Sequence, residues 1–208
     1  MGATKDVRRT ILDTSVGLVA ERGVRGVSFR EVARRSGVSH QAPYHHFGNL
    51  HGILRAIAIE GFDGLNAAMR AAAAGAGPDP ADALTAAGVA YVNFATSHVG
   101  HFRVMFSQSL VDIHDEDAPL EEAGGTYGLL TQLTKEAQEA GYGQGIETLV
   151  MAHMSWSMVH GMSVLFVEGV LKYKTEGLTD AERAAHAEQV VAALTKLLKS
   201  GRTPPQSS

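Results

Sequence analysis

One stretch decides the fold of this chain: Ser28-Phe-Arg-Glu-Val-Ala-Arg-Arg-Ser-Gly-Val-Ser-His-Gln-Ala-Pro-Tyr-His-His-Phe47. Ser28 followed three residues later by Glu31 is typical of a capping box, which begins a helix. Phe29, Val32 and Ala33 have the spacing of one buried helical stripe. The stretch therefore predicts a short amphipathic helix at its beginning.

A turn and a second short helix follow this amphipathic helix. Gly37 permits the left-handed backbone conformation that such a turn requires, and Val38 is the apolar residue beneath it. The second helix is predicted to begin at Ser39 and to end near Phe47. Two short helices joined by a glycine turn form a helix-turn-helix, whose second helix fits the major groove of DNA.

Hydrogen-bonding side chains lie at the beginning of this second helix, where a groove-bound helix meets the base edges. Gln41 can bond bidentately to adenine, His40 can donate or accept, and the methyl group of Ala42 can contact thymine. Tyr44 and His46 suit phosphate oxygens, which position a protein without reading sequence. The predicted DNA-binding residues are Arg30, Ser39, His40, Gln41, Ala42, Tyr44 and His46.

The charge of the chain is unevenly distributed. The net charge is -4, yet residues 1–60 contain nine Lys or Arg and five Asp or Glu, whereas the remainder contains nine and seventeen. Lys5, Arg8 and Arg30 can add charge-assisted contacts to phosphates. Such an asymmetry indicates a nucleic-acid-binding module joined to a second, acidic part.

Composition also limits the class of protein. The absence of cysteine excludes disulfides and thiolate metal sites and suits a reducing cytoplasm. Gly, Ser, His, Glu or Lys interrupts each long apolar run, so we expect no membrane span. Lys5, Asp6, Arg8 and Arg9 argue against a signal peptide. We therefore expect a cytoplasmic protein without a cofactor.

Patterns with a period of 3.6 residues recur along the chain and predict an all-α fold. We expect a DNA-binding domain at residues 1–50, a helical effector-binding and dimerisation domain at 51–202, an acidic loop at 112–119 and a disordered tail at 203–208. In the first helix, the residues predicted to face inward are Val7, Ile11, Leu12, Val16 and Val19. Predicted helices cover about 5–22, 28–36, 39–47, 50–74, 80–97, 100–108, 119–140, 145–171 and 179–200.

Three segments carry a resemblance to a known family: Ala20-Glu-Arg-Gly-Val-Arg-Gly-Val-Ser28, Arg30-Glu-Val-Ala-Arg-Arg-Ser-Gly-Val-Ser39 and Tyr44-His-His-Phe47. Over about the first 60 residues, the chain resembles the tetracycline-repressor (TetR) family of bacterial transcriptional regulators. The resemblance implies a homodimer that places two helix-turn-helix units in successive major grooves of a near-palindromic operator. It also implies a regulator, most often a repressor, that a small molecule releases from DNA.

The chain departs from the family's pattern just after Phe47. The family usually has a lysine at the start of the fourth helix, where it meets a phosphate, and this chain has Leu50-His51 there. The loss of one phosphate contact should weaken binding and reduce its salt dependence by about one unit of slope. Either His51 partly substitutes or the operator affinity is modest.

A second element, Trp156-Ser-Met-Val-His160-Gly161, lies in a long apolar helix and resembles the Trp-His-Gly type of C-terminal domain in one branch of the family. Both faces of this helix are apolar, so we expect both to be buried. One face contains Leu149, His153, Trp156, His160, Val164 and Val167, and the other contains Met151, Met154, Met158, Met162 and Leu165.

Family members bind a small molecule in this domain. The N–H groups of Trp156 and His160, set among apolar neighbours, suit a small hydrophobic or aromatic effector. Most of the other candidates are equally consistent with simple core packing. The predicted ligand-binding residues are Phe62, Phe94, Phe102, Met105, Phe106, Met154, Trp156 and His160.

The last predicted helix has an apolar side formed by Val190, Leu194, Leu197 and Leu198. This side could pack onto its own subunit or form a four-helix interface between two subunits. The family resemblance favours the dimer interface.

Three alternatives compete with a DNA-binding regulator. His98 and His101, with His114 nearby in sequence, have a possible metal-ligand spacing, but surface histidines explain them better. No nucleophile elbow, phosphate loop or Rossmann glycine pattern supports an enzyme. A helical ligand- or metal-binding dimer with weak or lost DNA binding remains the main alternative, supported by Leu50.

Overall fold

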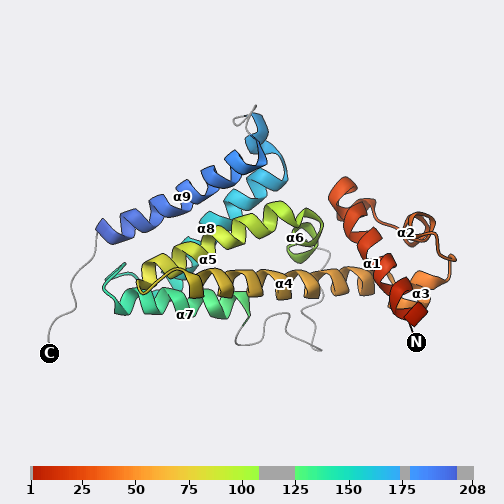
Figure 1. Ribbon diagram of the computed structural model, residues 1–208, viewed down its shortest axis with the longest axis horizontal. Helices are drawn as coiled ribbons and strands as arrows, with labels where there is room; N and C mark the ends of the chain where they lie inside the picture. The colour runs from red at the N-terminus through yellow and green to blue at the C-terminus, as the bar shows by residue number, and fades with distance from the viewer. Residues whose placement is uncertain (1, 108–124, 174–178, 201–208) are drawn as a thin grey trace. The chain divides into compact units, whose positions relative to one another are not determined.

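The computed structural model describes residues 2–107, 125–173 and 179–200 (Figure 1). Every regular element in these ranges is helical, which confirms the predicted all-α class. The predicted loop at 112–119 and the predicted tail at 203–208 lie outside the described residues. The elements are α1 Gly2–Arg22, η1 Val24–Gly26, α2 Phe29–Ser36, α3 Ala42–Phe47, α4 Leu50–Gly75, α5 Pro80–Ser97, α6 Val99–Met105, α7 Thr126–Glu139, α8 Thr148–Val167, η3 Val170–Tyr173 and α9 Asp180–Ser200.

The chain packs as two compact units that do not follow sequence order. Among the described residues, the first unit contains 2–63 and 98–107, and the second contains 64–97, 125–173 and 179–200. Helix α6 therefore packs with the N-terminal helices, although it follows α5 in sequence. The division into a DNA-binding domain at 1–50 and an effector-binding domain at 51–202 is a functional one, and it stays a prediction.

The core of the first unit forms where α1, α2 and the beginning of α4 meet. In α1, Ile11, Leu12 and Val19 are buried as predicted, while Val7 and Val16 are partly buried and pack against this core. Leu18 is also fully buried, and the buried Ser15 hydroxyl donates to the carbonyl of Ile11 at 2.8 Å. The core residues are Ile11, Leu12, Leu18, Val19, Val27, Phe29, Val32, Ile53, Leu54, Ile57, Ala58 and Val104.

Helix α6 packs directly on the backbone of α1. A Cβ atom at Gly100 would lie 2.3 Å from the carbonyl oxygen of Val16, so only glycine allows this approach. The guanidinium of Arg103 donates to the carbonyl of Ala20 at 2.8 Å. Carbonyls in the last turn of a helix lack partners within the helix, so Arg103 satisfies one end of α1. The orientation of α1 is thereby tied to that of α6.

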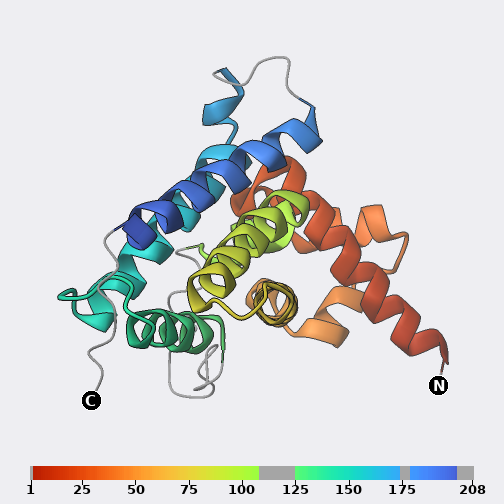
Figure 2. The ribbon, with the colours of Figure 1, turned by 60° about the vertical axis from the view of Figure 1, so that its left-hand side comes forward.

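Helix α5 is the centre of the second unit, where it contacts α7, α8 and α9 (Figure 2). A Cβ atom at Gly88 of α5 would lie 3.1 Å from Val191 of α9 and 3.3 Å from Val159 of α8. Lys199 joins the end of α9 to Asp79 at 2.9 Å and to Asp82 at 2.6 Å. Helix α9 therefore packs onto its own subunit along much of its length.

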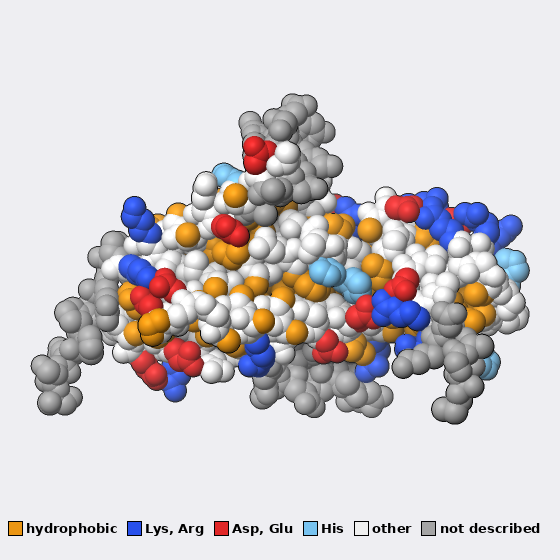
Figure 3. Space-filling model, in the orientation of Figure 1, with side chains coloured by type: hydrophobic (Ala, Val, Ile, Leu, Met, Phe, Trp, Pro, Cys, Tyr) orange, Lys and Arg blue, Asp and Glu red, His pale blue; other side chains and the backbone are white. Residues whose placement is uncertain are grey.

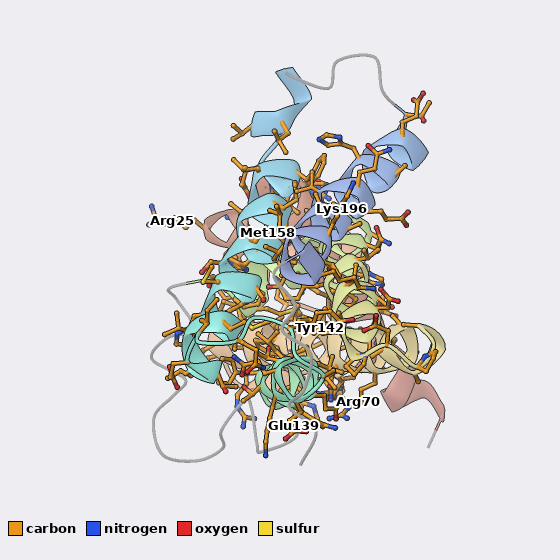
Figure 4. All side chains as sticks on the ribbon, turned by 90° about the vertical axis from the view of Figure 1, so that its left-hand side faces the viewer. Arg25, Arg70, Glu139, Tyr142, Met158 and Lys196 are labelled. Atoms are coloured by element: carbon orange, nitrogen blue, oxygen red, sulfur yellow. The ribbon has the colours of Figure 1, made fainter. Side chains whose placement is uncertain are left out.

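The same network includes Tyr142, which follows the end of α7. Tyr142 is 3 % exposed and donates its hydroxyl to Asp79 at 3.0 Å (Figure 4). In α9, Ala187 and Val191 are buried, whereas Leu197 is 69 % exposed. The predicted apolar side of α9 is thus only partly used within one subunit, because packing on α5 selects a neighbouring stripe.

Helix α8 differs from the prediction in how much of its surface is buried. By length and composition alone it is apolar enough to cross a membrane, because its Ser, His and Gly residues do not offset the aliphatic ones. The core helix of a soluble protein meets the same criterion, so this composition does not contradict the expectation of no membrane span. Within the chain, α8 buries one stripe and not two opposite faces: Met151, Ala152, Ser155, Val159 and Ser163.

Much of the remaining apolar surface of α8 is exposed, while Met158, Met162 and Phe166 are half-buried. Small side chains at Ala152, Ser155 and Ser163 let neighbouring helices approach that stripe closely, and Met151 and Val159 fill the space beside them. The exposed residues are Leu149, Val150, Met154, Trp156, Val164 and Leu165, at 37–54 % of their accessible area.

Candidate functional site

The first helix of the helix-turn-helix begins and ends as its sequence predicts. The Ser28 hydroxyl accepts from the Glu31 amide at 3.3 Å, which is the N-cap half of a capping box. Phe29, Val32 and Ala33 are the buried residues of α2. Gly37 has φ 68, in the left-handed region, and the amide of Val38 donates to the carbonyl of Ala33. The turn is therefore built by local backbone bonding.

The second helix begins later than predicted. Helix α3 starts at Ala42, not at Ser39, and Gln41 is its N-cap. Pro43 has no N–H, so it cannot donate to the carbonyl of Ser39 as a helix starting there would require. Ser39 and His40 consequently lie in the turn before α3, and the first bond of the helix runs from the amide of His45 to the carbonyl of Gln41.

Most of the predicted base-reading side chains are accessible. Ser39, His40 and Gln41 are exposed, and Ala42 is half-buried against the core of the unit. Tyr44 is 54 % exposed, and its ring packs edge-on against Phe29 with centroids 4.3 Å apart. Because Phe29 is buried in α2, this contact fixes the position of the Tyr44 ring and therefore that of its hydroxyl group. The remaining two predicted residues are the exposed Arg30 and the half-buried His46.

A cluster of ion pairs compensates some of the basic charge of α2. Glu31 pairs with Arg34 at 2.8 Å and with Arg35 at 3.2 Å, and Arg35 also pairs with Glu21 at 2.7 Å. The hydrogen bond from Arg34 lowers the pKa of Glu31 to about 2, so this carboxylate stays ionised near neutral pH. Arg34 and Arg35 therefore stabilise α2, and their charges are compensated by carboxylates.

Other basic residues nearby have no such compensation. No carboxylate in the described residues pairs with Arg25 or Arg30, and Arg25 projects away from η1 in Figure 4. Figure 3 shows Lys and Arg side chains gathered around the part of the first unit that contains α2. The surface beside α3 therefore carries positive charge, as contacts with phosphates require.

The turn between α3 and α4 is tight. Gly48 has φ 72, and the side chain of Asn49 accepts from the amide of Gly52 at 2.9 Å, which makes Asn49 the cap of α4. A Cβ atom at Gly52 would lie 2.1 Å from the carbonyl oxygen of Phe47. Phe47 and Leu50 both pack against the core of the unit, and the leucine side chain offers a phosphate no charge.

The eight predicted ligand-binding residues divide between the two units. In the first unit, Phe62 and Phe106 have ring centroids 5.7 Å apart, and those of Phe102 and Phe106 are 5.2 Å apart. A Cβ atom at Gly61 would lie 2.6 Å from the sulfur of Met105, so Met105 packs on α4. These four residues form one apolar group.

The other four predicted residues lie in the second unit. Phe94 packs on Gly64, where a Cβ atom would be 3.1 Å from its ring, and it is buried. The rings of Trp156 and His160 are 6.0 Å apart, whereas Met154 is 54 % exposed on another side of α8. Trp156 and His160 are thus brought together, and Met154 is not brought to them.

Two tyrosines that the sequence did not single out complete a row with these residues. The hydroxyl of Tyr91 lies 2.8 Å from Nδ1 of His160, and the hydroxyl of Tyr127 lies 3.0 Å from Nε2 of His153. The rings of Tyr127 and Trp156 are 6.2 Å apart. Burial lowers the pKa of His160, so its imidazole is neutral near pH 7. The row offers hydrogen-bonding groups on aromatic rings.

The histidines proposed as an alternative metal site have other contacts. Within the described ranges, no three His, Asp or Glu side chains are grouped so that they could hold a metal ion. Nε2 of His101 lies 3.1 Å from Glu60, and the ring of His98 packs at 6.0 Å from that of His101. His114 lies outside the described residues.

Known families and structures match both halves of the chain. Residues 11–57 match the model of bacterial regulatory proteins of the tetR family, and residues 84–194 match that of the tetracyclin repressor-like C-terminal domain. No curated protein matches the sequence.

Several solved structures share the fold over nearly their whole length. A protein of unknown function from Rhodococcus sp. RHA1 is 30% identical, with a TM-score of 0.71 and coverage of 94% of this chain and 95% of that one. The TetR family transcriptional regulator PfmR from Thermus thermophilus is 22% identical, with a TM-score of 0.66 and coverage of 92% and 97%. AibR, solved with isovaleryl coenzyme A and operator DNA, is 18% identical, with a TM-score of 0.65 and coverage of 95% and 100%.

Proposed function

The chain belongs to the TetR family and is a transcriptional regulator with a DNA-binding domain, and we propose that it is a dimeric repressor that a small hydrophobic or aromatic molecule releases from a near-palindromic operator. The family assignment points to a regulator and away from an enzyme. The observation that carries the proposal is the exposed end of α3, held by the buried stripe of α2.

DNA recognition is supported by the geometry of the turn and α3. Ser39, His40 and Gln41 are exposed at the N-terminal end of α3, which is where a recognition helix meets base edges. Tyr44 is fixed on Phe29 and is suited to a phosphate. We assign Gln41 to base reading, with His40 and Ala42 beside it, and Arg30, Tyr44 and His46 to the sugar-phosphate backbone.

Dimerisation is supported by the exposed apolar surface of α8. Its six exposed apolar side chains form a broad surface on a single subunit, and contiguous apolar surfaces of this kind usually mark an interaction site. Leu197, which is 69 % exposed on α9, belongs to the same proposal. A second copy of the chain would bury both helices and form a four-helix interface.

Effector binding is supported by the row of Tyr91, Tyr127, His153, Trp156 and His160 in the second unit. The groups in this row are polar but uncharged where burial keeps His160 neutral, so they suit a ligand with an aromatic or apolar body and a neutral polar group. AibR binds isovaleryl coenzyme A, a ligand with an apolar acyl group. We propose an apolar effector for this chain on the residues alone.

The proposed switch requires that the ligand prefer one of two states. A ligand that bound the operator-competent and released states equally would shift nothing, so the effector must bind the released state more tightly. Within the first unit, α6 holds α1 through Gly100 and Arg103. A displacement of α6 would therefore move α1 and the helix-turn-helix that packs on it.

Selection of bound fragments from the source genome tests the proposal. The purified protein should enrich a near-palindromic sequence, and the genes next to it should indicate the chemistry of the effector. A variant with Gln41→Ala and Tyr44→Ala should enrich nothing, since the selected sequence must depend on α3. Enrichment of the same sequence by that variant would show that α3 does not read DNA.

The alternative function is a ligand-binding dimer without DNA binding. Leu50, which packs in the core in place of the family's lysine, favours it. A protein that enriches no sequence, yet binds an apolar ligand and forms a dimer, would establish this alternative.

A further inference from the structure

The first turn of α4, residues 50–53, contains no lysine or arginine. Leu50 is the first residue of α4 and packs against the core, and the next residue, His51, is exposed. A phosphate that lies near this turn would therefore find no fixed positive charge on the first turn of α4. A regulator with this sequence needs another cation at the same end of α3.

Arg8 supplies a cation at that end. Its guanidinium carbon lies 4.8 Å from the centroid of the Phe47 ring, within the range of a cation–π contact. Phe47 is the last residue of α3 and stands three residues before Leu50. Gly52 keeps the intervening turn tight, because no larger residue would fit against the carbonyl of Phe47. The charge of Arg8 is therefore held over the α3–α4 turn.

Arg8 and its neighbour Arg9 differ in their charged contacts. No carboxylate among the described side chains pairs with Arg8, which is exposed. Its neighbour Arg9 provides the contrast: Arg9 pairs with Glu60 at 2.7 Å and with Asp13. These hydrogen bonds raise the pKa of Arg9 and lower that of Glu60. Two adjacent arginines thus have different roles, because Arg9 stabilises the packing of α1 on α4 while Arg8 faces solvent.

We propose that Arg8, oriented by the ring of Phe47, is the phosphate-binding residue that takes the place of the family's lysine at position 50. A guanidinium binds phosphate bidentately, and stacking on an aromatic ring leaves its N–H groups directed outward around the edge of the plane. The contact comes from α1 and not from α4. This inference rests on the proposed function, since it needs an operator.

The salt dependence of operator binding tests it. Fluorescence anisotropy with the genomically selected duplex would be measured from about 50 to about 200 mM KCl for the wild type, R8Q and R9Q. Each phosphate contact contributes about 0.9 to the slope of log K against log salt, so the loss of one contact per subunit reduces the slope of a dimer by about 1.8. The affinity advantage of the wild type over R8Q should then shrink about 12-fold across this range.

The matched variant R9Q removes the same charge one residue away. It should keep the wild-type slope, and its melting temperature reports any loss of the Glu60 pair separately. L50K should add slope, and the double variant R8Q/L50K should regain the wild-type slope. A wild-type slope in R8Q, or equal losses in R8Q and R9Q, would overturn the assignment of Arg8. Failure of the wild type to bind any duplex would instead refute the proposed function itself.

Discussion

The helix-turn-helix and helix α8 differ in how their buried surfaces arise. In α2, a single stripe of Phe29, Val32 and Ala33 is buried, and a cap and a glycine mark both ends. Helix α8 is apolar on most of its circumference, yet only the stripe through Ser155 and Val159 is buried within the chain. An amphipathic helix has one solution for its packing, whereas a helix that is apolar all round depends on its neighbours to select one. The two regions therefore differ in how directly sequence determines burial.

The largest effect is expected at the exposed end of α3. Replacing Gln41 and Tyr44 by alanine should weaken operator binding by at least about 30-fold, since each base or phosphate contact is lost in both subunits and a good base contact is worth about 1–3 kcal/mol. Anisotropy with the selected duplex measures the loss. Because the Tyr44 ring packs on Phe29, circular dichroism should show a somewhat lower melting temperature with an unchanged helical spectrum; loss of that spectrum would mean that the pair supports the fold instead.

A somewhat smaller effect is expected on the exposed surface of α8. Leu165→Glu would place a charge in the proposed dimer interface, at a site that is 41 % exposed in the single chain. An unpaired buried charge costs about 2–5 kcal/mol, so sedimentation should show monomers at concentrations where the wild type is dimeric. Lys135→Glu on exposed α7 is the matched control. Dimers of unchanged affinity in Leu165→Glu would exclude this surface as the interface.

The contact between α1 and α6 predicts opposite results for two glycines. Gly100→Ala would place a Cβ 2.3 Å from the carbonyl of Val16, so the free energy of unfolding should fall by about 1–3 kcal/mol. Gly17→Ala, in α1 with nothing within 4 Å of its Cβ, should raise it by about 0.5–1 kcal/mol. Urea denaturation measures both changes. Stabilisation by both substitutions would show that α6 does not pack closely on α1.

The smallest effect concerns His160. Burial lowers its pKa in the folded protein, so the unfolded chain binds more protons once the pH falls below the ordinary histidine pKa of about 6.5. Stability from this group is complete above that pH and is lost as the pH falls toward the folded-state pKa. His160→Gln should therefore reduce the drop in melting temperature between about pH 7.5 and about pH 5.5. An equal drop in both proteins would mean that His160 titrates alike in the folded and unfolded chains.

The first 60 residues can be predicted well because their signals are local. Ser28, Gly37 and Asn49 act on backbone groups within four residues of themselves, so their effect can be inferred without knowing the fold. The sequence pattern places the start of α3 three residues too early, because helical spacing alone takes no account of the missing N–H of Pro43. Even this error is a local one.

The effector residues are harder to group because their partners come from distant segments. Tyr91 and Tyr127 meet His160 and His153 across 69 and 26 residues of sequence, and no periodicity within one helix reveals such pairs. Phe62 joins Phe106 in the first unit, while Phe94 packs in the second. The helical spacing of aromatic residues alone could not show which of them belong to the same unit.

The sequence by itself determined the helical class, the helix-turn-helix, its caps and the family to which the chain belongs. Those features depend on hydrogen bonds and side-chain spacing that are settled within one or two turns of helix. Only the tertiary structure decided which stripe of α8 is buried, that α6 holds α1, and that Arg8 lies over Phe47 while Arg9 is compensated by Glu60. These choices depend on surfaces brought together from distant parts of the chain, where close packing selects one arrangement among several that the pattern allows.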